Sequence, residues 1–139
     1  MNTELDEALV KKYPKIFRDR HADMMTTAMC WGFECDDGWY NIIDALCANM
    51  QNHIDWREKN GHEVPQVVAE QVKEKFGGLR FYYRGGDDVI DGMVQMAESI
   101  SERTCETCGA PGTPTTGGWI RTLCDQHQQE QEYYTKEKF

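Results

Sequence analysis

Residues 73–83 read KEKFGGLRFYY, and this short stretch predicts the centre of the fold. Strand-like runs of alternating side chains stand on both sides of the pair Gly77-Gly78. A glycine pair can adopt the positive φ angles that a two-residue hairpin loop requires. The sequence therefore predicts an antiparallel β-hairpin over residues 67–84, with these two glycines as its loop.

The alternation sorts the side chains of this hairpin onto two faces. A Gly77-Gly78 loop places Lys75 opposite Arg80, and it leaves Glu74 as the misfit on a mainly apolar face. That face is expected to pack on the core with the side chains of Val72, Phe76, Leu79 and Phe81. The other face gathers four cations around a tyrosine: Lys73, Lys75, Arg80, Tyr82 and Arg84.

These cations are unexpected because the chain as a whole is acidic. Its 15 Lys and Arg residues against 24 Asp and Glu residues leave a formal net charge of −9. Such a charge opposes binding to duplex DNA, whose affinity depends on many cationic contacts to phosphate. An anion that binds to this chain should therefore be small and held locally.

The length of 139 residues predicts a single domain, residues 1–139. No stretch approaches the roughly 20 apolar residues of a membrane span, and the amino-terminal residues do not resemble a signal peptide. We therefore expect a soluble cytoplasmic protein with no membrane partner.

Apolar residues at helical spacing predict three helices around the hairpin. The first covers residues 4–12, the second follows a cap at Asp36 or Asp37, and the third begins at Asp87 or Asp88. The third helix carries the apolar stripe Val89, Ile90, Met93, Met96, Ala97 and Ile100. The predicted fold class is α+β, with helices packed on a small antiparallel sheet.

The carboxyl-terminal third carries the pattern of a zinc site. Cys105 and Cys108 form a Cys-x-x-Cys pair before Gly109, and Cys124 with His127 forms a Cys-x-x-His pair. Two such pairs are typical of a tetrahedral structural Zn²⁺ site, which four protein ligands close to water. Turn residues, a short strand over residues 119–123 and a helix from about Asp125 complete a predicted treble-clef subdomain over residues 105–137.

Three further cysteines, Cys30, Cys35 and Cys47, leave two interpretations open. They can form a second metal site with His21 or His53, although their spacing matches no compact zinc motif. They can instead be buried thiols, because free cysteine behaves as a small apolar side chain.

Three stretches, in this order, resemble a family of small proteins encoded by tailed bacteriophages and prophages. They read CWGFECDDGWYNIIDALC from residue 30, VAEQVKEKFGGLRFYY from residue 68 and CETCGAPG...GWIRTLCDQH from residue 105. The resemblance extends from about Tyr13 to His127. It implies an accessory phage protein that acts in the cytoplasm of a bacterial host, and it assigns no catalytic residue.

We expect a protein without enzymatic activity. The sequence contains no Ser/His/Asp set, no phosphate-binding glycine-rich loop that opens a helix and no HExxH pair. The favoured hypothesis is capture of a small phosphate-bearing ligand on the basic face, where Arg and Lys hold phosphate and Tyr82 stacks on a base. By analogy with other phage proteins, that ligand is a host nucleotide immune signal, so that the protein counters a defence.

Two alternatives stay open. The zinc-stabilised subdomain and the acidic surface can instead form an interaction module that inhibits or recruits a host or phage protein. Charged strand faces are also often simply solvated, and the four cations can pair with the surplus carboxylates of the same chain. The sequence leaves the ligand, the protein partner and a homo-oligomeric state undecided.

Overall fold

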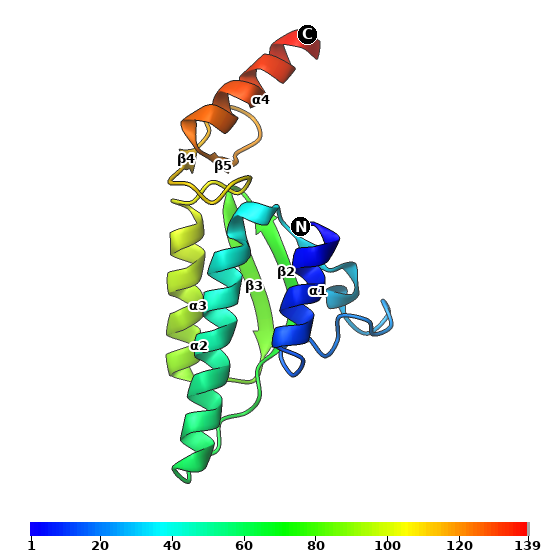
Figure 1. Cartoon of the computed structure of the whole chain (residues 1–139), viewed down its shortest axis with the longest axis vertical. Coiled ribbons are helices and arrows are strands. Elements are labelled where there is room, and N and C mark those ends of the chain that lie inside the picture. Colours follow the sequence, from blue (N-terminus) through cyan, green and yellow to red (C-terminus); the bar gives the residue numbers. More distant parts are fainter. Residues whose placement is uncertain (139) are drawn as a thin grey trace.

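The computed structural model describes residues 1–138, and it describes side chains up to Tyr133. Its helices are α1 (Thr3–Lys12), α2 (Tyr40–Lys59), α3 (Asp88–Ser101) and α4 (Asp125–Lys138), with short 3₁₀ turns η1 (Ala28–Trp31) and η2 (Asp37–Trp39). Its strands are β1 (Phe33–Glu34), β2 (Val68–Lys75), β3 (Gly78–Arg84), β4 (Thr113–Pro114) and β5 (Thr122–Leu123). This mixture of helices and small sheets confirms the α+β class (Figure 1).

The main sheet is mixed, which corrects the prediction of a purely antiparallel sheet. Strands β2 and β3 form the predicted antiparallel hairpin. The short strand β1 joins the outer edge of β2 in parallel, with Phe33 opposite Val72. The connection from β1 to β2 is the long helix α2, which gives a parallel pair the crossover that it needs.

The hairpin turns one residue earlier than predicted. Lys75 pairs with Gly78, so the two-residue loop is Phe76-Gly77, with φ angles of 54° and 80°. Two positive φ angles in succession are the mark of a type I′ hairpin turn. Phe76 is consequently 71% exposed at the tip, and its predicted place on the core face is wrong.

The two predicted faces of the hairpin are kept in spite of this change of register. From Gln71 to Lys75, each residue of β2 pairs with a residue two positions away from the predicted partner, and side chains alternate between the faces with a period of two. Val72 still shares the core side with Leu79 and Phe81, and all three are buried. Arg80 now lies opposite Lys73, and Tyr82 lies opposite Gln71. A bulge between Ala69 and Gln71 then shifts the register at the far end of the hairpin.

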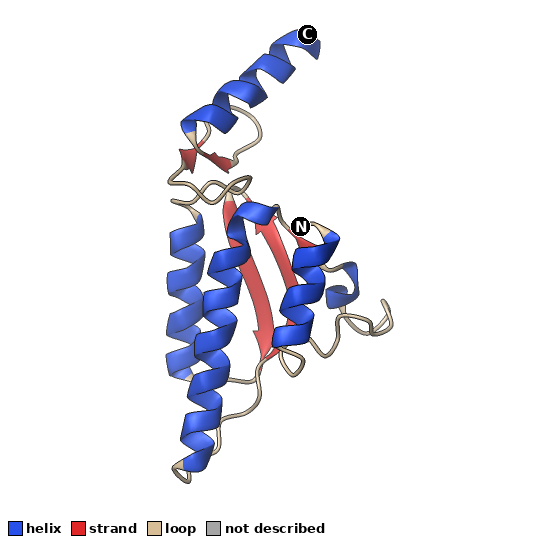
Figure 2. Cartoon of the chain, viewed as in Figure 1, coloured by secondary structure: helices blue, strands red, loops and turns tan. Residues whose placement is uncertain are grey.

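Helices α1, α2 and α3 cover one face of the hairpin, and the carboxyl-terminal segment extends beyond its tip (Figures 1 and 2). The core between these layers includes Leu9, Trp39, Ile43, Met50, Val72, Leu79, Phe81, Ile90 and Val94. Asn2 caps α1 and Asp87 caps α3 through side-chain bonds to backbone amides. The predicted cap of the second helix at Asp36 or Asp37 is wrong, because the 3₁₀ turn η2 intervenes and α2 begins at Tyr40, directly after Trp39.

The apolar stripe of α3 is only partly used by this core. Ile90, Val94 and Ala97 are buried, and Met93 packs at the edge of the core. Three members of the predicted core stripe are instead exposed on the outside of the helix: Val89, Met96 and Ile100.

Candidate metal centre and adjoining cavities

The four predicted metal ligands lie together in the carboxyl-terminal segment. The donor atoms of Cys105, Cys108, Cys124 and His127 are all within 4.8 Å of one another. Cys108 Sγ lies 3.8 Å from Cys124 Sγ, and His127 Nδ1 lies 3.5 Å from Cys105 Sγ and 3.1 Å from Cys124 Sγ. The residue types and their clustering are those of a metal centre.

These distances fit a tetrahedral ion. Metal–ligand lengths of about 2.3 Å for sulfur and about 2.0 Å for nitrogen place neighbouring sulfurs about 3.8 Å apart, and sulfur and nitrogen about 3.5 Å apart. Two of the three separations match these values, and the contact of Cys124 with His127 is somewhat shorter. Four protein donors would fill the coordination sphere of such an ion.

A tight turn prepares the first ligand pair. The Gly109 amide donates to the Cys105 carbonyl at 2.9 Å, and Gly109 has a φ of 84°, which only glycine adopts freely. Burial raises the pKa of the Cys105 thiol, but hydrogen bonds from the amides of Cys124, Cys108 and Thr107 outweigh burial and lower this pKa to about 6. Thiolate is the form that binds a metal.

The second pair stands at the start of α4, as predicted. Cys124 immediately precedes the helix, and its carbonyl accepts the amide of Gln128 at 2.9 Å. His127 lies in the first turn, with Nδ1 toward the cysteines and Nε2 3.9 Å from the Glu130 carboxylate. At this distance the carboxylate is too far for a hydrogen bond to the imidazole. The strand before this pair is shorter than predicted, because β5 holds only Thr122 and Leu123.

The turn of the first ligand pair is fastened to the start of α2. The Gly38 amide donates to the Glu106 carbonyl at 2.7 Å, and Trp39 Nε1 donates to the Thr104 carbonyl at 3.0 Å. A Cβ atom at Gly38 would lie only 2.2 Å from the Cys105 carbonyl oxygen. The glycine is therefore required by the close approach of two backbones.

The carboxyl-terminal segment also binds the tip of the β2–β3 hairpin and the residues before α2. Thr122 Oγ1 donates to the Gly77 carbonyl at 2.6 Å, and a Cβ atom at Gly77 would lie 3.1 Å from the Ile120 side chain. The Asp36 amide donates to Glu106 Oε2 at 3.0 Å, while Arg121 binds Asp36 Oδ2 at 2.8 Å. All three quoted sequence stretches thus meet at one junction.

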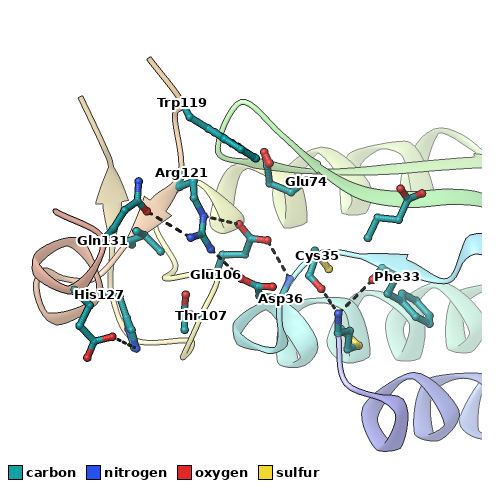
Figure 3. A pocket seen from close by; sticks show the side chains of 14 residues that line it. Phe33, Cys35, Asp36, Glu74, Glu106, Thr107, Trp119, Arg121, His127 and Gln131 are labelled. Atoms are coloured by element: carbon teal, nitrogen blue, oxygen red, sulfur yellow. Dashed lines mark hydrogen bonds and ion pairs between the residues drawn. The ribbon is translucent and has the colours of Figure 1, made fainter. Parts of the chain in front are cut away.

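A cavity of about 960 Å³ lies at this junction (Figure 3). We name it the junction cavity, and its lining residues include Phe33, Asp36, Glu74, Glu106, Trp119, Arg121, Leu123 and His127. Five carboxylates line it, from Glu34, Asp36, Glu74, Glu106 and Glu130, against the guanidinium of Arg121 and the amino terminus of Met1. The cavity therefore combines apolar walls with a surplus of negative charge.

The cations of the junction cavity are already engaged. Arg121 donates to Asp36 and approaches Glu106 at 3.9 Å, and the Met1 amino group donates to the carbonyls of Phe33 and Cys35. Glu74, by contrast, makes no hydrogen bond or ion pair with any described side chain, and it lies at the rim with Trp119 (Figure 3). Trp119 is 76% exposed.

The structure divides the predicted basic face in two. Lys73, Tyr82 and Arg84 line a second cavity of about 410 Å³, which we name the hairpin cavity, together with Thr26, Thr27, Ala28, Glu70 and Gln71. Lys75 and Arg80 are not among its lining residues. Arg80 donates to the Leu79 carbonyl at 3.0 Å, and the Lys75 ammonium lies 5.6 Å from the centre of the Phe76 ring.

The cations of the hairpin cavity have internal partners. Arg84 makes an ion pair with Asp19 at 3.1 Å and another with Glu70 at 3.7 Å. The Lys73 ammonium lies 6.0 Å from the centre of the Tyr82 ring, at the limit of a cation–π contact. The ion pairs of Arg84 agree with the alternative in which cations of the basic face pair with carboxylates of the same chain.

The three other cysteines lie apart from the metal centre. Cys35 and Cys47 are buried in the core, and burial raises the pKa of Cys35 to about 12 and that of Cys47 well above its usual range. The Cys30 thiol donates to the Thr27 carbonyl at 3.3 Å. His53, a conceivable fourth ligand, binds Asp87 at 2.8 Å. Among the described residues, only the four predicted ligands cluster as a metal centre.

The sequence interpretation missed most of the junction cavity. Asp36 reads as a helix cap and Arg121 as part of a strand, and nothing in their spacing indicates that they meet across 85 residues. One signal was available, because Glu74 breaks the apolar face of the hairpin and the structure places it in this cavity.

Comparisons of the chain with models of protein families, with curated proteins and with solved structures give no match. Across residues 1–138, no helix is both long and apolar enough to cross a membrane.

Proposed function

We propose that the protein is a non-catalytic binding module that takes a basic segment of a partner protein into the junction cavity. The observation that carries this proposal is the cavity itself, which has a volume of about 960 Å³ and five lining carboxylates. Its volume lies at the upper end of the range for ligand pockets, about 300–1,000 Å³.

The metal centre serves this module by holding the walls of the cavity. In the proposal the ion is Zn²⁺, and the turn, the β4–β5 hairpin and α4 form a treble-clef finger around it. Two residues of this segment line the cavity: His127, which is one of the four predicted ligands, and Leu123, which directly precedes the ligand Cys124. A zinc ion with four protein ligands has no open position for water, so its role is structural.

Trp119 and Glu74 provide the chemistry for a basic side chain. An arginine that enters between them can stack on the exposed indole and pair with the free carboxylate. Aromatic residues beside a charged anchor commonly dominate the binding energy of an interface. Following the resemblance to phage proteins, we propose that this partner is a host or phage protein in a bacterial cell.

The test uses synthetic peptides of one length that carry arginine, lysine, glutamate or neutral residues, titrated by calorimetry. We expect the arginine peptide to bind more tightly than the lysine peptide, and the acidic and neutral peptides not to bind. Trp119→Ala and Glu74→Gln should each weaken binding of the arginine peptide by about 1–2 kcal/mol.

Matched variants separate the cavity from general surface charge. Trp56→Ala removes another exposed tryptophan, and Glu63→Gln removes another exposed carboxylate. Neither lies at the junction cavity, so both should bind the arginine peptide as the wild type does. Equal losses in the matched and the cavity variants would reject the junction cavity as the binding site.

A second function is supported by the hairpin cavity. We propose, as the alternative, that it holds a small phosphate-bearing ligand, such as a nucleotide immune signal of the host. Three of the five residues predicted from the sequence line it, and the hydroxyl-bearing Thr26 and Thr27 add hydrogen-bonding groups. A phosphate there would compete with Asp19 and Glu70 for Arg84.

Calorimetric titration of cyclic dinucleotides and of adenine dinucleotides tests this alternative. Arg84→Ala should weaken binding by about 1.5–3 kcal/mol, because a guanidinium binds phosphate through charged hydrogen bonds. Tyr82→Ala should cost about 1–3 kcal/mol if a base stacks there. Arg80→Ala is the matched control, since this arginine lies on the same face but outside the cavity. Nucleotide binding that survives both cavity substitutions would move the site elsewhere.

A further inference from the structure

The outer side of α3 carries an apolar stripe that no described residue covers. Val89 is 52% exposed, Met96 is 66% exposed and Ile100 is 46% exposed. On a helix these positions follow at intervals of seven and four residues, so they lie along one line. Such a line of apolar residues is typical of a buried helix face. The core of the chain, however, buries only the adjacent side of α3, which carries Ile90, Val94 and Ala97.

The stripe is flanked by small residues that let another helix approach. Gly92 and Ser99 are both exposed, and they lie beside Met96 on the surface of the helix. A Cβ atom at Gly92 would have no neighbour within 4 Å. A glycine in a helix costs about 0.5–1 kcal/mol relative to alanine, and no contact among the described residues of one chain requires a glycine at this position of α3.

Opposite charges stand at the two ends of the same stripe. Asp88 begins α3, and Arg103 lies just beyond its end. Both side chains are exposed, and neither makes an ion pair with a described side chain. If two such helices run antiparallel about a centre between Gln95 and Met96, residue 88 of each lies opposite residue 103 of the other, and residue 92 lies opposite residue 99.

We propose that this stripe is covered by a second copy of the same chain, which packs its α3 antiparallel to the first. Val89, Met96 and Ile100 of the two copies then bury one another, and the small residues Gly92 and Ser99 meet. Asp88 pairs with Arg103 of the second copy at both ends. A twofold interface of this kind must be self-complementary, and this stripe meets that condition in the opposite charges of Asp88 and Arg103 at its two ends.

Sedimentation equilibrium of the full metal-loaded chain over a wide range of concentrations tests this pairing. The wild type should convert from monomer to dimer as its concentration rises. Met96→Glu places two carboxylates at the centre of the interface and should weaken dimerisation at least tenfold. Met25→Glu changes another exposed methionine, outside α3, and should leave the dimer unchanged.

Charge reversal separates this geometry from other modes of association. Asp88→Arg alone and Arg103→Asp alone should each weaken the dimer, because each places like charges opposite one another. The double variant should restore association to near the level of the wild type. Circular dichroism of each variant checks that α3 stays folded.

A wild type that stays monomeric at all concentrations would overturn the proposal and leave the stripe to a different protein. Failure of the double variant to recover, with each single variant folded, would also overturn the antiparallel pairing. A dimer that Met96→Glu leaves intact would place the interface elsewhere on the chain.

Discussion

Single glycines decide how the carboxyl-terminal segment meets the rest of the chain. Gly77 and Gly61 have almost the same φ, 80° and 79°, but different surroundings. A Cβ atom at Gly77 would press on Ile120 and Thr122, whereas one at Gly61 would have no neighbour within 4 Å. These two positions therefore separate the cost of the backbone conformation from the cost of crowding.

We predict that Gly61→Ala lowers the free energy of unfolding by about 1–2 kcal/mol, the cost of a left-handed conformation for a residue with a side chain. Gly77→Ala should lower the free energy of unfolding by more than Gly61→Ala does. The new Cβ atom adds to the conformational cost because it would displace Ile120 and strain the hydrogen bond from Thr122. Denaturant unfolding of both variants measures the difference. Equal losses would show that the junction does not crowd Gly77.

At the scale of elements, the hairpin and the ligand pairs could be predicted because each depends on neighbours in sequence. The glycine pair, the alternation of side chains and the two Cys/His spacings are local signals. The turn lies one residue earlier than predicted, and Thr122, far along the chain, donates to the Gly77 carbonyl there. The parallel partner β1 could not be foreseen, since two residues are too few to show a pattern.

The prediction that the whole apolar stripe of α3 packs in the core was partly wrong for a different reason. Periodicity identifies apolar positions on a helix, but it does not say which of them face the core of the same chain. Val89 and Met96 fit the helical period as well as Ile90 and Ala97 do, and only the packing distinguishes them. The junction cavity was missed because its carboxylates come from several separate stretches of sequence.

The strands β4 and β5 and the helix α4 should depend on the metal, because ligation contributes folding energy directly. Elemental analysis of protein purified without chelator should give one zinc per chain. Chelation, or Cys108→Ala, should loosen residues 105–138 while the core of α2 and the hairpin stays folded. Hydrogen exchange resolved by segment measures this difference.

Thiol labelling gives an independent check on the same centre. In the metal-loaded protein, Cys35 and Cys47 should resist alkylation because burial raises the pKa of both thiols and excludes the reagent. After chelation, Cys105, Cys108 and Cys124 should become reactive while those two stay protected. Rapid labelling of all six cysteines after chelation would indicate that the metal supports the whole fold.

The charge of the whole molecule acts in opposite directions on the two proposed contacts. A net charge of −9 attracts a basic peptide to the junction cavity, and it repels a second copy of the chain. Salt shortens the range of both effects, from about 30 Å at 0.01 M to about 3 Å at 1 M. The exposed pairs between Asp88 and Arg103 would contribute at most about 1 kcal/mol each, and we expect the repulsion between copies to exceed this contribution at low salt.

We therefore predict salt dependences of opposite sign. Added salt should weaken binding of the arginine peptide and strengthen dimerisation, because the dimer is held mainly by the apolar stripe of α3. Calorimetry for the peptide and sedimentation equilibrium for the dimer, in the same series of salt concentrations, measure the two slopes. The Met96→Glu variant should keep the slope for the peptide and lose the dimer at every salt concentration. A dimer that dissociates as salt is added would mean that ion pairs hold the two copies together, and it would contradict the apolar interface.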